Sequence, residues 1–321
     1  MKSGPGTEVG IGDDAAVLAA PDGRVVATTD FLLEGRHFRR DWAGPADIGH
    51  RAAVRSLADV AAMGARATAL LVAFAAPAAL SSAWALDLSA GLAAEAERAG
   101  ATVAGGDTAR FDRVLLAVTG LGDLQGRPPV TRAGARPGDV VAVAGPLGHS
   151  AAGLALLEAG HRAPGAPGTA QREQAPPSAG QPGLAALITA HLRPAPPYDA
   201  GPEAADLGAT ALMDVSDGLL ADLAHIADAS RVAVNVHPAA LDPAPLIPAA
   251  EVLGLGAAAP LEWMLTGGED HSLVAAFPPG TPLPPRWLVI GDVREGEGVL
   301  VDGRPHPGAG GWEHFPNSSW H

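Results

Sequence analysis

Apolar runs of two lengths alternate along the chain. Short runs rich in Val, Ala and Leu predict β-strands, and longer stretches with apolar residues every three or four positions predict amphipathic helices. This alternation is typical of an α/β protein. The predicted strands are Arg24–Thr29, Arg113–Thr119, Val140–Ala144, Ala209–Met213, Val232–Val236 and Ser272–Ala276. The predicted helices are Ala46–Met63, Leu86–Ala99, Ala151–Ala159 and Gly218–Ala229.

A break in this pattern predicts two domains. The strand at 140–144 ends in a Gly-Pro-Leu-Gly turn, and a second α/β block follows it. We therefore expect residues 1–145 and 146–321 to form an N-terminal and a C-terminal domain, a division that suits a chain of 321 residues. Residues 161–183 are rich in Pro and Gly with almost no large apolar side chain, so we expect a mobile loop there.

The composition excludes several classes of protein. The chain has no cysteine, which rules out disulfides, thiolate metal sites and Cys nucleophiles. Its formal net charge of −14 argues against binding to nucleic acid or to an anionic membrane surface. The longest weakly polar run, at 67–80, is too short to span a bilayer, and the first residues lack an apolar signal segment. We therefore expect a cytoplasmic protein.

The shortage of lysine narrows the chemistry further. Lys2 is the only lysine in the chain. A Walker-type phosphate loop and the usual protein-kinase site each need a lysine on the nucleotide phosphates. Any phosphate chemistry in this protein must therefore depend on metal ions, arginine and backbone N–H groups.

Several carboxylates lie where a solvated surface position does not easily explain them. Asp30 ends the predicted strand at 24–29, and Asp107 follows a short strand-like segment and two glycines. Asp59 lies on the apolar part of its predicted helix, where a carboxylate needs a charge partner or a metal. The Asp13-Asp14 pair follows a Gly-rich turn, where capping is the ordinary explanation.

Three polar residues lie between a predicted strand and a predicted helix: Asp214, Ser216 and Asp217. Capping of the helix by Asp214 or Ser216 explains one of them. The segment also resembles a serine-hydrolase nucleophile elbow, but Asp214 occupies the position of its first glycine. The histidines form no His-Glu-x-x-His motif, so a zinc-hydrolase site has no support. Carboxylates without Cys favour Mg²⁺ or Mn²⁺, and hence metal-assisted phosphoryl transfer.

Together the motifs resemble those of the thiamine-monophosphate kinase family, in the superfamily that includes aminoimidazole ribonucleotide synthetase. The matching stretches are GIGDDAAVL (10–18), TTDFLLEGRHF (28–38), SLADVAAMGA (56–65), GGDTAR (105–110), VTRAGARPGD (130–139), MDVSDGLLADL (213–223), LTGGEDHSL (265–273) and GGWEHF (310–315). The resemblance implies transfer of the γ-phosphoryl group of ATP to thiamine monophosphate, a two-domain α/β fold, a homodimer formed through the N-terminal domains, and several Mg²⁺ ions.

The resemblance also implies roles for individual residues. The implied metal ligands are Asp14, Thr28, Thr29, Asp30, Asp59, Asp107, Asp214 and Asp217. The implied ATP contacts are Gly106, Asp107, Arg132 and Ser216, and the implied thiamine contacts are His37, Glu269 and Trp312. Of these residues we expect Asp107, Arg132 and Asp217 to be catalytic. The family usually has a longer segment before the Gly-Asp-Asp motif than this chain has.

Other functions remain open at this point. Selenophosphate synthetase and the hydrogenase-maturation enzyme use Cys or selenocysteine, which this chain lacks. Aminoimidazole ribonucleotide synthetase is the enzymatic alternative, although EGRHF and GGWEHF argue against it. A nucleotide-binding protein that has lost turnover is the non-enzymatic alternative.

Overall fold

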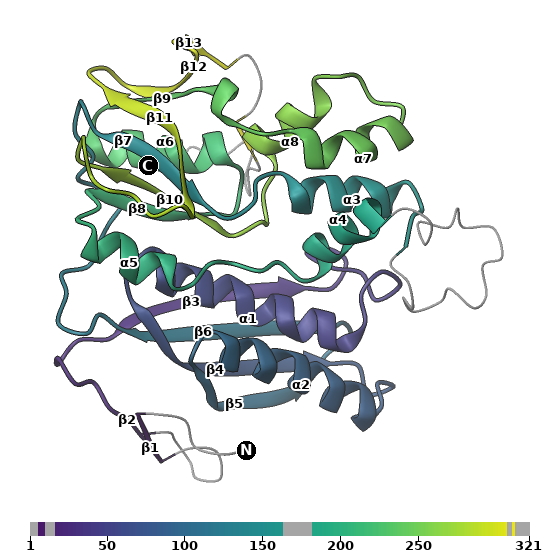
Figure 1. The fold of residues 1–321 in the computed structure, drawn as a ribbon. Coiled ribbons are helices and arrows are strands. Elements are labelled where there is room, and N and C mark those ends of the chain that lie inside the picture. The colour runs from purple at the N-terminus through teal and green to yellow at the C-terminus, as the bar shows by residue number, and fades with distance from the viewer. Residues whose placement is uncertain (1–5, 10–16, 163–181, 307–309, 312–321) are drawn as a thin grey trace.

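The computed structural model describes residues 6–9, 17–162, 182–306 and 310–311, which form two main β-sheets with helices against them (Figure 1). The first sheet has the strand order β3-β6-β4-β5. Its strands are β3 (Val26–Leu33), β4 (Arg66–Ala76), β5 (Thr102–Arg110) and β6 (Leu115–Asp123). Strand β6 is antiparallel to β3 and β4, and β4 is parallel to β5. A separate pair joins β1 (Thr7–Val9) to β2 (Val17–Leu18).

The second sheet has seven strands in the order β13-β12-β9-β11-β7-β10-β8. They are β7 (Val140–Ala144), β8 (Ala211–Val215), β9 (Ala233–Val236), β10 (Ser272–Phe277), β11 (Trp287–Arg294), β12 (Gly298–Val301) and β13 (Arg304–Pro305). Strand β10 is antiparallel to both of its neighbours, β7 and β8. The mixture of sheets and helices confirms the predicted α/β class.

Two long helices cover one face of the first sheet, and one of them also contacts the second sheet. Helix α1 (Pro45–Ala62) packs against β3, β6 and α2 (Ser82–Arg98), and its other side contacts β8 and β10 (Figure 1). The remaining helices are α3 (His149–Glu158), α4 (Pro182–Leu192), α5 (Ala200–Asp206), α6 (Leu219–Ser230), α7 (Ile247–Val252) and α8 (Ala259–Thr266). Helix α1 therefore lies where the two sheets meet.

Local sequence explains how α1 and α2 begin and how closely they pack. Pro45 occupies the first turn of α1, and the Asp47 carboxylate accepts a hydrogen bond from the Gly44 amide at 2.9 Å. The Ser81 hydroxyl accepts a hydrogen bond from the Trp84 amide at the start of α2. A Cβ atom at Gly49 would overlap the backbone of α2, so glycine allows this close contact.

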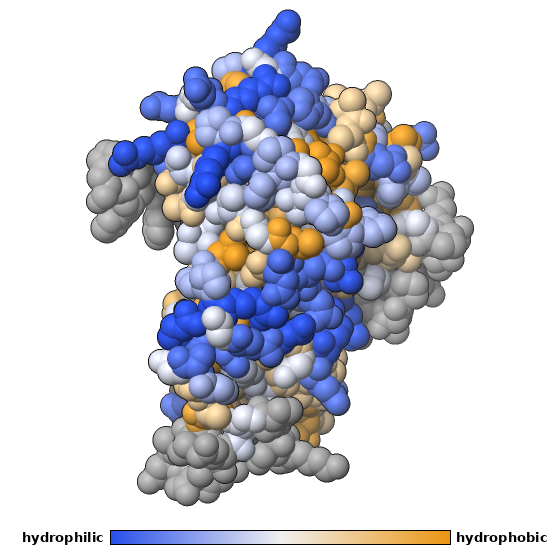
Figure 2. Space-filling model, turned by 60° about the vertical axis from the view of Figure 1, so that its left-hand side comes forward, coloured by the Kyte–Doolittle hydropathy of each residue, from blue (hydrophilic) through white to orange (hydrophobic). Residues whose placement is uncertain are grey.

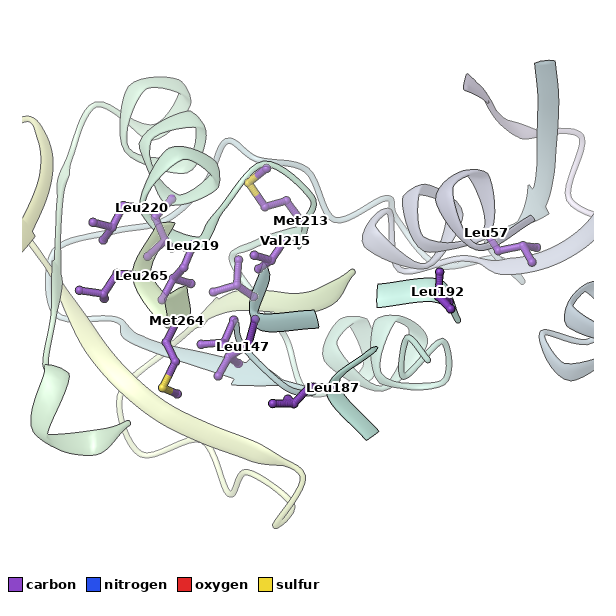
Figure 3. Close-up of a cluster of buried hydrophobic side chains, with 14 of the residues drawn as sticks. Leu57, Leu147, Leu187, Leu192, Met213, Val215, Leu219, Leu220, Met264 and Leu265 are labelled. Carbon is purple, nitrogen blue, oxygen red and sulfur yellow. The ribbon is translucent and has the colours of Figure 1, made fainter. Parts of the chain in front are cut away.

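The core joins the two halves of the molecule. One buried cluster contains Leu57 of α1, Leu192 of α4, and Met213 and Val215 of β8 in the second sheet (Figure 3). On the face shown in Figure 2, hydrophilic residues predominate and hydrophobic ones form small groups. Within the described residues, no helix has the length and apolar character needed to cross a membrane.

Each predicted strand exists. For three strands, the observed ends differ from the predicted ones in a way that affects the candidate site. Strand β3 continues to Leu33, so the prediction that Asp30 ends a strand was wrong. Strand β5 runs through Asp107, and β8 is shifted by two residues and contains Asp214. In each case a polar residue inside a strand was interpreted as the start of a loop.

Other elements were not predicted at all. They are the strands β1, β2, β4, β11, β12 and β13 and the helices α4, α5, α7 and α8. Helix α4 begins at Pro182, so the last two residues of the predicted loop at 161–183 are helical. Residues 163–181, residues 10–16 with Asp14, and Trp312 lie outside the described residues.

Candidate functional site

Three of the predicted carboxylates come together from three elements. Asp30 lies on β3, Asp59 on α1 and Asp214 on β8. Burial and the neighbouring charges of Asp214 and Asp30 together raise the pKa of Asp59 to about 7, against the effect of a hydrogen bond from Thr28. The Thr28 hydroxyl donates that hydrogen bond to Asp59 Oδ2 at 2.6 Å. The site thus concentrates negative charge that a bound cation would neutralise.

The buried partner of Asp214 is His271. The Nδ1 atom of His271 lies 3.0 Å from Asp214 Oδ2, and both side chains are almost fully buried. Burial would lower the pKa of His271, but its contact with Asp214 and the charge of Glu269, whose Oε2 atom lies 3.8 Å from Nε2, outweigh burial and raise the pKa to about 9. His271 is therefore an imidazolium ion at neutral pH. His271 was not among the predicted site residues, although it follows Glu269-Asp270 directly.

Two arginines from one face of α1 hold Glu269. Arg55 Nη1 donates to Glu269 Oε1 at 2.5 Å, and Arg51 Nη2 donates to Oε2 at 2.9 Å. Burial would raise the pKa of Glu269, but the charges of Arg51 and Arg55 hold it well below its ordinary value. Arg55 Nε also lies 3.8 Å from Asp30 Oδ1. Arg55 therefore connects the carboxylate cluster to Glu269.

The segment that carries Glu269 has an unusual backbone. Glu269 and His271 adopt φ values of 67° and 54°, a left-handed conformation that costs energy for residues other than glycine. Between them, Asp270 is buried and accepts hydrogen bonds from the Gly148 and Ser150 amides. Burial raises the pKa of Asp270 to about 7, since these two hydrogen bonds only partly offset it. Asp270 thus anchors the strained turn to the start of α3.

A cavity of about 450 Å³ lies next to this turn. Its lining includes His37, Arg51, Arg55, Ser216, Asp217 and Glu269. Apolar side chains of Phe38, Trp42 and Leu154 complete part of the wall. The structure thus brings together His37 and Glu269, which were predicted to contact one substrate, and places them beside Ser216 and Asp217.

The turn before α6 differs from the predicted capping arrangement. No side chain caps this helix at its N-cap residue, Gly218. Instead, Asp222 Oδ2 accepts hydrogen bonds from the amides of Ser216, Asp217 and Gly218, at 2.9 to 3.1 Å. The prediction that Asp214 or Ser216 caps the helix was therefore wrong. Asp222 could have been suspected because it lies among the apolar positions of the helix.

Two predicted residues lie away from the carboxylate cluster within this chain, and a third is exposed. Gly106 and Asp107 lie on the edge strand β5, which two strands separate from β3, about 14 Å along the sheet. Asp107 is exposed and accepts a hydrogen bond from the Thr108 amide. Arg132 is exposed, and its carbonyl accepts a hydrogen bond from Ser230 at the end of α6.

The remaining predicted residues occupy varied positions. Thr29 is exposed on β3 and donates to the Val118 carbonyl, so its side chain lies on the opposite face from Thr28. His37 Nδ1 accepts a hydrogen bond from the Leu33 amide at 3.0 Å. Gly311 packs against Asp217 and Ala221, so the last described residue before Trp312 lies beside the start of α6.

Known proteins resemble this chain in sequence along most of its length. Residues 12–124 match the family described as AIR synthase related protein, N-terminal domain. The chain is 46% identical over 310 residues to the thiamine-monophosphate kinase of Mycobacterium tuberculosis, an alignment that covers 96% of this chain and 86% of that protein. The chain belongs to the thiamine-monophosphate kinase family. This finding confirms the family resemblance drawn from the motifs.

Solved structures of thiamine-monophosphate kinases share the fold. The enzyme from Stenotrophomonas maltophilia K279a has a TM-score of 0.80 and 33% identity, covering 94% of this chain and 93% of its own. AaThiL complexed with AMPPCP and TMP also has a TM-score of 0.80 and 33% identity, covering 95% and 92%. The predicted aminoimidazole ribonucleotide synthetase-like fold is thereby confirmed.

Proposed function

We propose that this protein transfers the γ-phosphoryl group of ATP to the phosphate of thiamine monophosphate and so forms thiamine diphosphate. Family membership supports the activity, and a relative of the same fold binds AMPPCP and TMP together. The observation in this chain that carries the proposal is the position of Arg55. It lies between Asp30 of the carboxylate cluster and Glu269 of the cavity, and so connects a cation-attracting site with an acceptor site.

We further propose that the carboxylate cluster holds Mg²⁺. The donors fit this ion, because they are hard oxygen atoms whose mutual repulsion already raises the pKa of Asp59. Within residues 6–9, 17–162, 182–306 and 310–311, no three acidic or histidine side chains converge to hold an ion alone. Mg²⁺ typically takes one or two carboxylates and completes its shell with phosphate oxygens and water. The proposed ligands at the cluster are Asp14, Thr28, Asp30, Asp59, Asp214 and Asp217. The resemblance also implies Thr29 and Asp107, but their side chains would not meet this ion, because Thr29 faces the other side of β3 and Asp107 lies on β5.

The proposal gives separate roles to the metal ligands, the ATP contacts and the acceptor contacts. Bound Mg²⁺ would supply charge neutralisation between two polyanionic substrates. Gly106, Asp107, Arg132 and Ser216 would contact ATP. Asp107 lies too far from Asp30 for one ion to bind both within a chain, so it would meet a different part of the nucleotide or a second copy. His37, Glu269 and Trp312 would contact the acceptor, with Glu269 facing its cationic or amino-bearing rings.

The mechanism that suits these residues is direct in-line attack by the acceptor phosphate. That phosphate is ionised at neutral pH and needs no general base, and the chain offers no Cys and no lysine beyond Lys2 as a covalent carrier. Asp107, Arg132 and Asp217 would then act by positioning and by charge, not as nucleophiles. Inversion at a chirally labelled γ-phosphorus supports this route, whereas retention contradicts it. ADP–ATP isotope exchange without the acceptor also contradicts it.

We also propose a cytoplasmic homodimer that associates through the first sheet. Helices α1 and α2 cover one face of this sheet, and the strand alternation directs Phe31, Leu115 and Leu121 to the opposite face. Phe31 is 56% exposed there. An apolar sheet face of this kind suits a second copy of the chain. The division into domains at residues 145 and 146 remains part of the proposal.

A coupled assay of ADP release tests the proposed activity. ADP should appear with ATP, Mg²⁺ and thiamine monophosphate together, and not with ATP and Mg²⁺ alone. ADP release only with formylglycinamidine ribonucleotide, the substrate type of an aminoimidazole ribonucleotide synthetase, would contradict the proposal. ATP binding without turnover of either acceptor would instead identify a nucleotide-binding protein.

A further inference from the structure

A closed circuit of contacts lies beside the cavity. It includes the side chains of Ser150 and His191, to which no role has been assigned so far. His191 Nε2 lies 3.0 Å from Arg51 Nη1, and His191 Nδ1 lies 3.0 Å from Ser150 Oγ. Arg51 in turn donates to Glu269. The Ser150 amide donates to Asp270, the residue bonded to Glu269, at 2.8 Å. The circuit thus joins α1, α3 and α4 to the strained turn.

The chemistry of the partners fixes the state of His191. A guanidinium group only donates hydrogen bonds, so Nε2 of His191 must accept one from Arg51. The ring is then neutral, and its proton lies on Nδ1, which donates to Ser150 Oγ. Burial, together with the charge of Arg51, lowers the pKa of His191 to about 3, in agreement with this assignment. His191 therefore acts as a fixed acceptor for Arg51.

The circuit controls the orientation of Glu269. The side chain of Arg51 is only 6% exposed, so a guanidinium N–H that lost its acceptor at His191 could not turn to bulk water. Arg51 would then move, and Glu269 would lose one of its two arginine contacts. We propose that His191 is a positioning residue of the acceptor site, which holds Arg51 and through it aims the Glu269 carboxylate at the rings of thiamine monophosphate. This inference rests on the proposed function.

The position of the circuit predicts a selective effect. Arg51, Ser150, His191 and Glu269 all line the cavity. The hydrogen bonds of His191 and Ser150 lead to Arg51, to Asp270 and to each other, and not to Asp30 or Asp59 in the carboxylate cluster. Disruption of the circuit should therefore weaken the binding of thiamine monophosphate and leave the binding of ATP almost unchanged. Arg55 still holds Glu269, so the loss should be partial.

Steady-state kinetics of three variants test the inference. His191→Leu fills the space without an acceptor, and His191→Gln restores an oxygen acceptor near the position of Nε2. We expect His191→Leu to raise the KM for thiamine monophosphate about 10-fold, as the loss of one buried hydrogen-bond acceptor allows. We expect the KM for ATP to stay within about twofold, and His191→Gln to recover most of the acceptor KM. Thr189→Ala, at an exposed position of the same helix, is the matched control.

Two results would overturn the inference. The first is an equal rise of both KM values in His191→Leu, which indicates general loss of structure. The second is a His191→Gln variant as impaired as His191→Leu.

A measurement without turnover separates this inference from the proposed function. Nitrogen-15 NMR of histidine-labelled protein should show His191 neutral, with its proton on Nδ1, at pH 7. Protonation on Nε2 would overturn the positioning role whatever the protein phosphorylates. Absence of ADP release from the wild-type protein, with His191 in the expected tautomer, would count against the proposed function alone.

Discussion

His271 and Asp214 form a buried pair in which Nδ1 lies 3.0 Å from the carboxylate oxygen Oδ2. The histidine comes from the strained turn, and the aspartate comes from the middle of the site on β8. The pair therefore ties the turn to the carboxylate cluster. Its positive member offsets part of the negative charge that the cluster concentrates.

Removal of His271 should destabilise the protein by leaving Asp214 without its partner. We expect His271→Leu to lower the free energy of unfolding by about 3 kcal/mol, measured by urea denaturation in EDTA. Added Mg²⁺ should restore part of this loss, because a cation can replace the imidazolium charge. The double variant Asp214→Asn/His271→Leu buries no unpaired charge, so its free energy of unfolding should fall by less than that of His271→Leu. Equal losses in the single and double variants would contradict the pairing.

Asp59→Asn should separate activity from stability. We expect activity to fall at least about 100-fold, in the range reported for loss of one preorganised electrostatic group. The pKa of Asp59 is raised to about 7, so its contribution to folding is present below about pH 4 and is lost as the pH rises through 7. At pH 8 without metal, the melting temperature of the variant should therefore equal or exceed that of the wild type. Near-normal turnover at saturating Mg²⁺ would rule out Asp59 as a ligand.

His191 should make stability depend on pH in the opposite direction. Its folded pKa of about 3 lies below the ordinary value of 6.5, so its contribution is complete above pH 6.5 and is lost as the pH falls toward 3. Arg51, Ser150 and Glu269 face it from the neighbouring elements. Relative to His191→Gln, the wild type should lose about 1 kcal/mol of unfolding free energy per pH unit below 6.5. Parallel stability curves of the two proteins between pH 4.5 and 7.5 would refute this expectation.

The close packing of Gly311 allows a test of whether the C-terminal segment contributes to the acceptor site. A Cβ atom there would overlap the Asp217 carbonyl and lie 2.7 Å from the Ala221 Cβ. Gly311→Ala should therefore displace Trp312 and raise the KM for thiamine monophosphate severalfold, with little change in melting temperature. Gly310→Ala is the control, because its nearest atom would be 3.3 Å away, which asks for only a small adjustment. Equal KM values in the two variants would show that the segment does not contribute to the acceptor site.

The fold class and many elements followed from apolar periodicity, but strand ends did not. Asp30, Asp107 and Asp214 each lie within a strand whose polar residue was expected to begin a loop. Apolar periodicity reflects burial alone. Asp214 is accommodated inside its strand by the contact with His271, and Asp107 is accommodated because it is exposed. Strand β4 was missed because its small apolar residues show no alternation.

The site was predicted in part, because spatial convergence is invisible in the sequence. The motifs named Asp30, Asp59, Asp214 and Glu269, which the structure brings near one another. The residues that support the site through their contacts were missed: Arg51, Arg55, Asp222, Asp270 and His271. Four of these five lie inside or beside the motifs, where their four-residue spacing or apolar surroundings were a usable signal. His191 lies outside every motif, and only the packing of α4 reveals its contact.

Helix α1 carries Arg51, Arg55 and Asp59 at four-residue intervals, about 6 Å apart along one stripe. One helix therefore fixes the spacing between the proposed metal site and the proposed acceptor site. A shift of α1 would move Arg51, Arg55 and Asp59 together. Substitutions that shift this helix would therefore alter both sites and could not change one without the other. Substitutions meant to change the acceptor specificity should instead be made in α3, α4 or the C-terminal segment. Changes there would leave Asp59 and the proposed metal site in place.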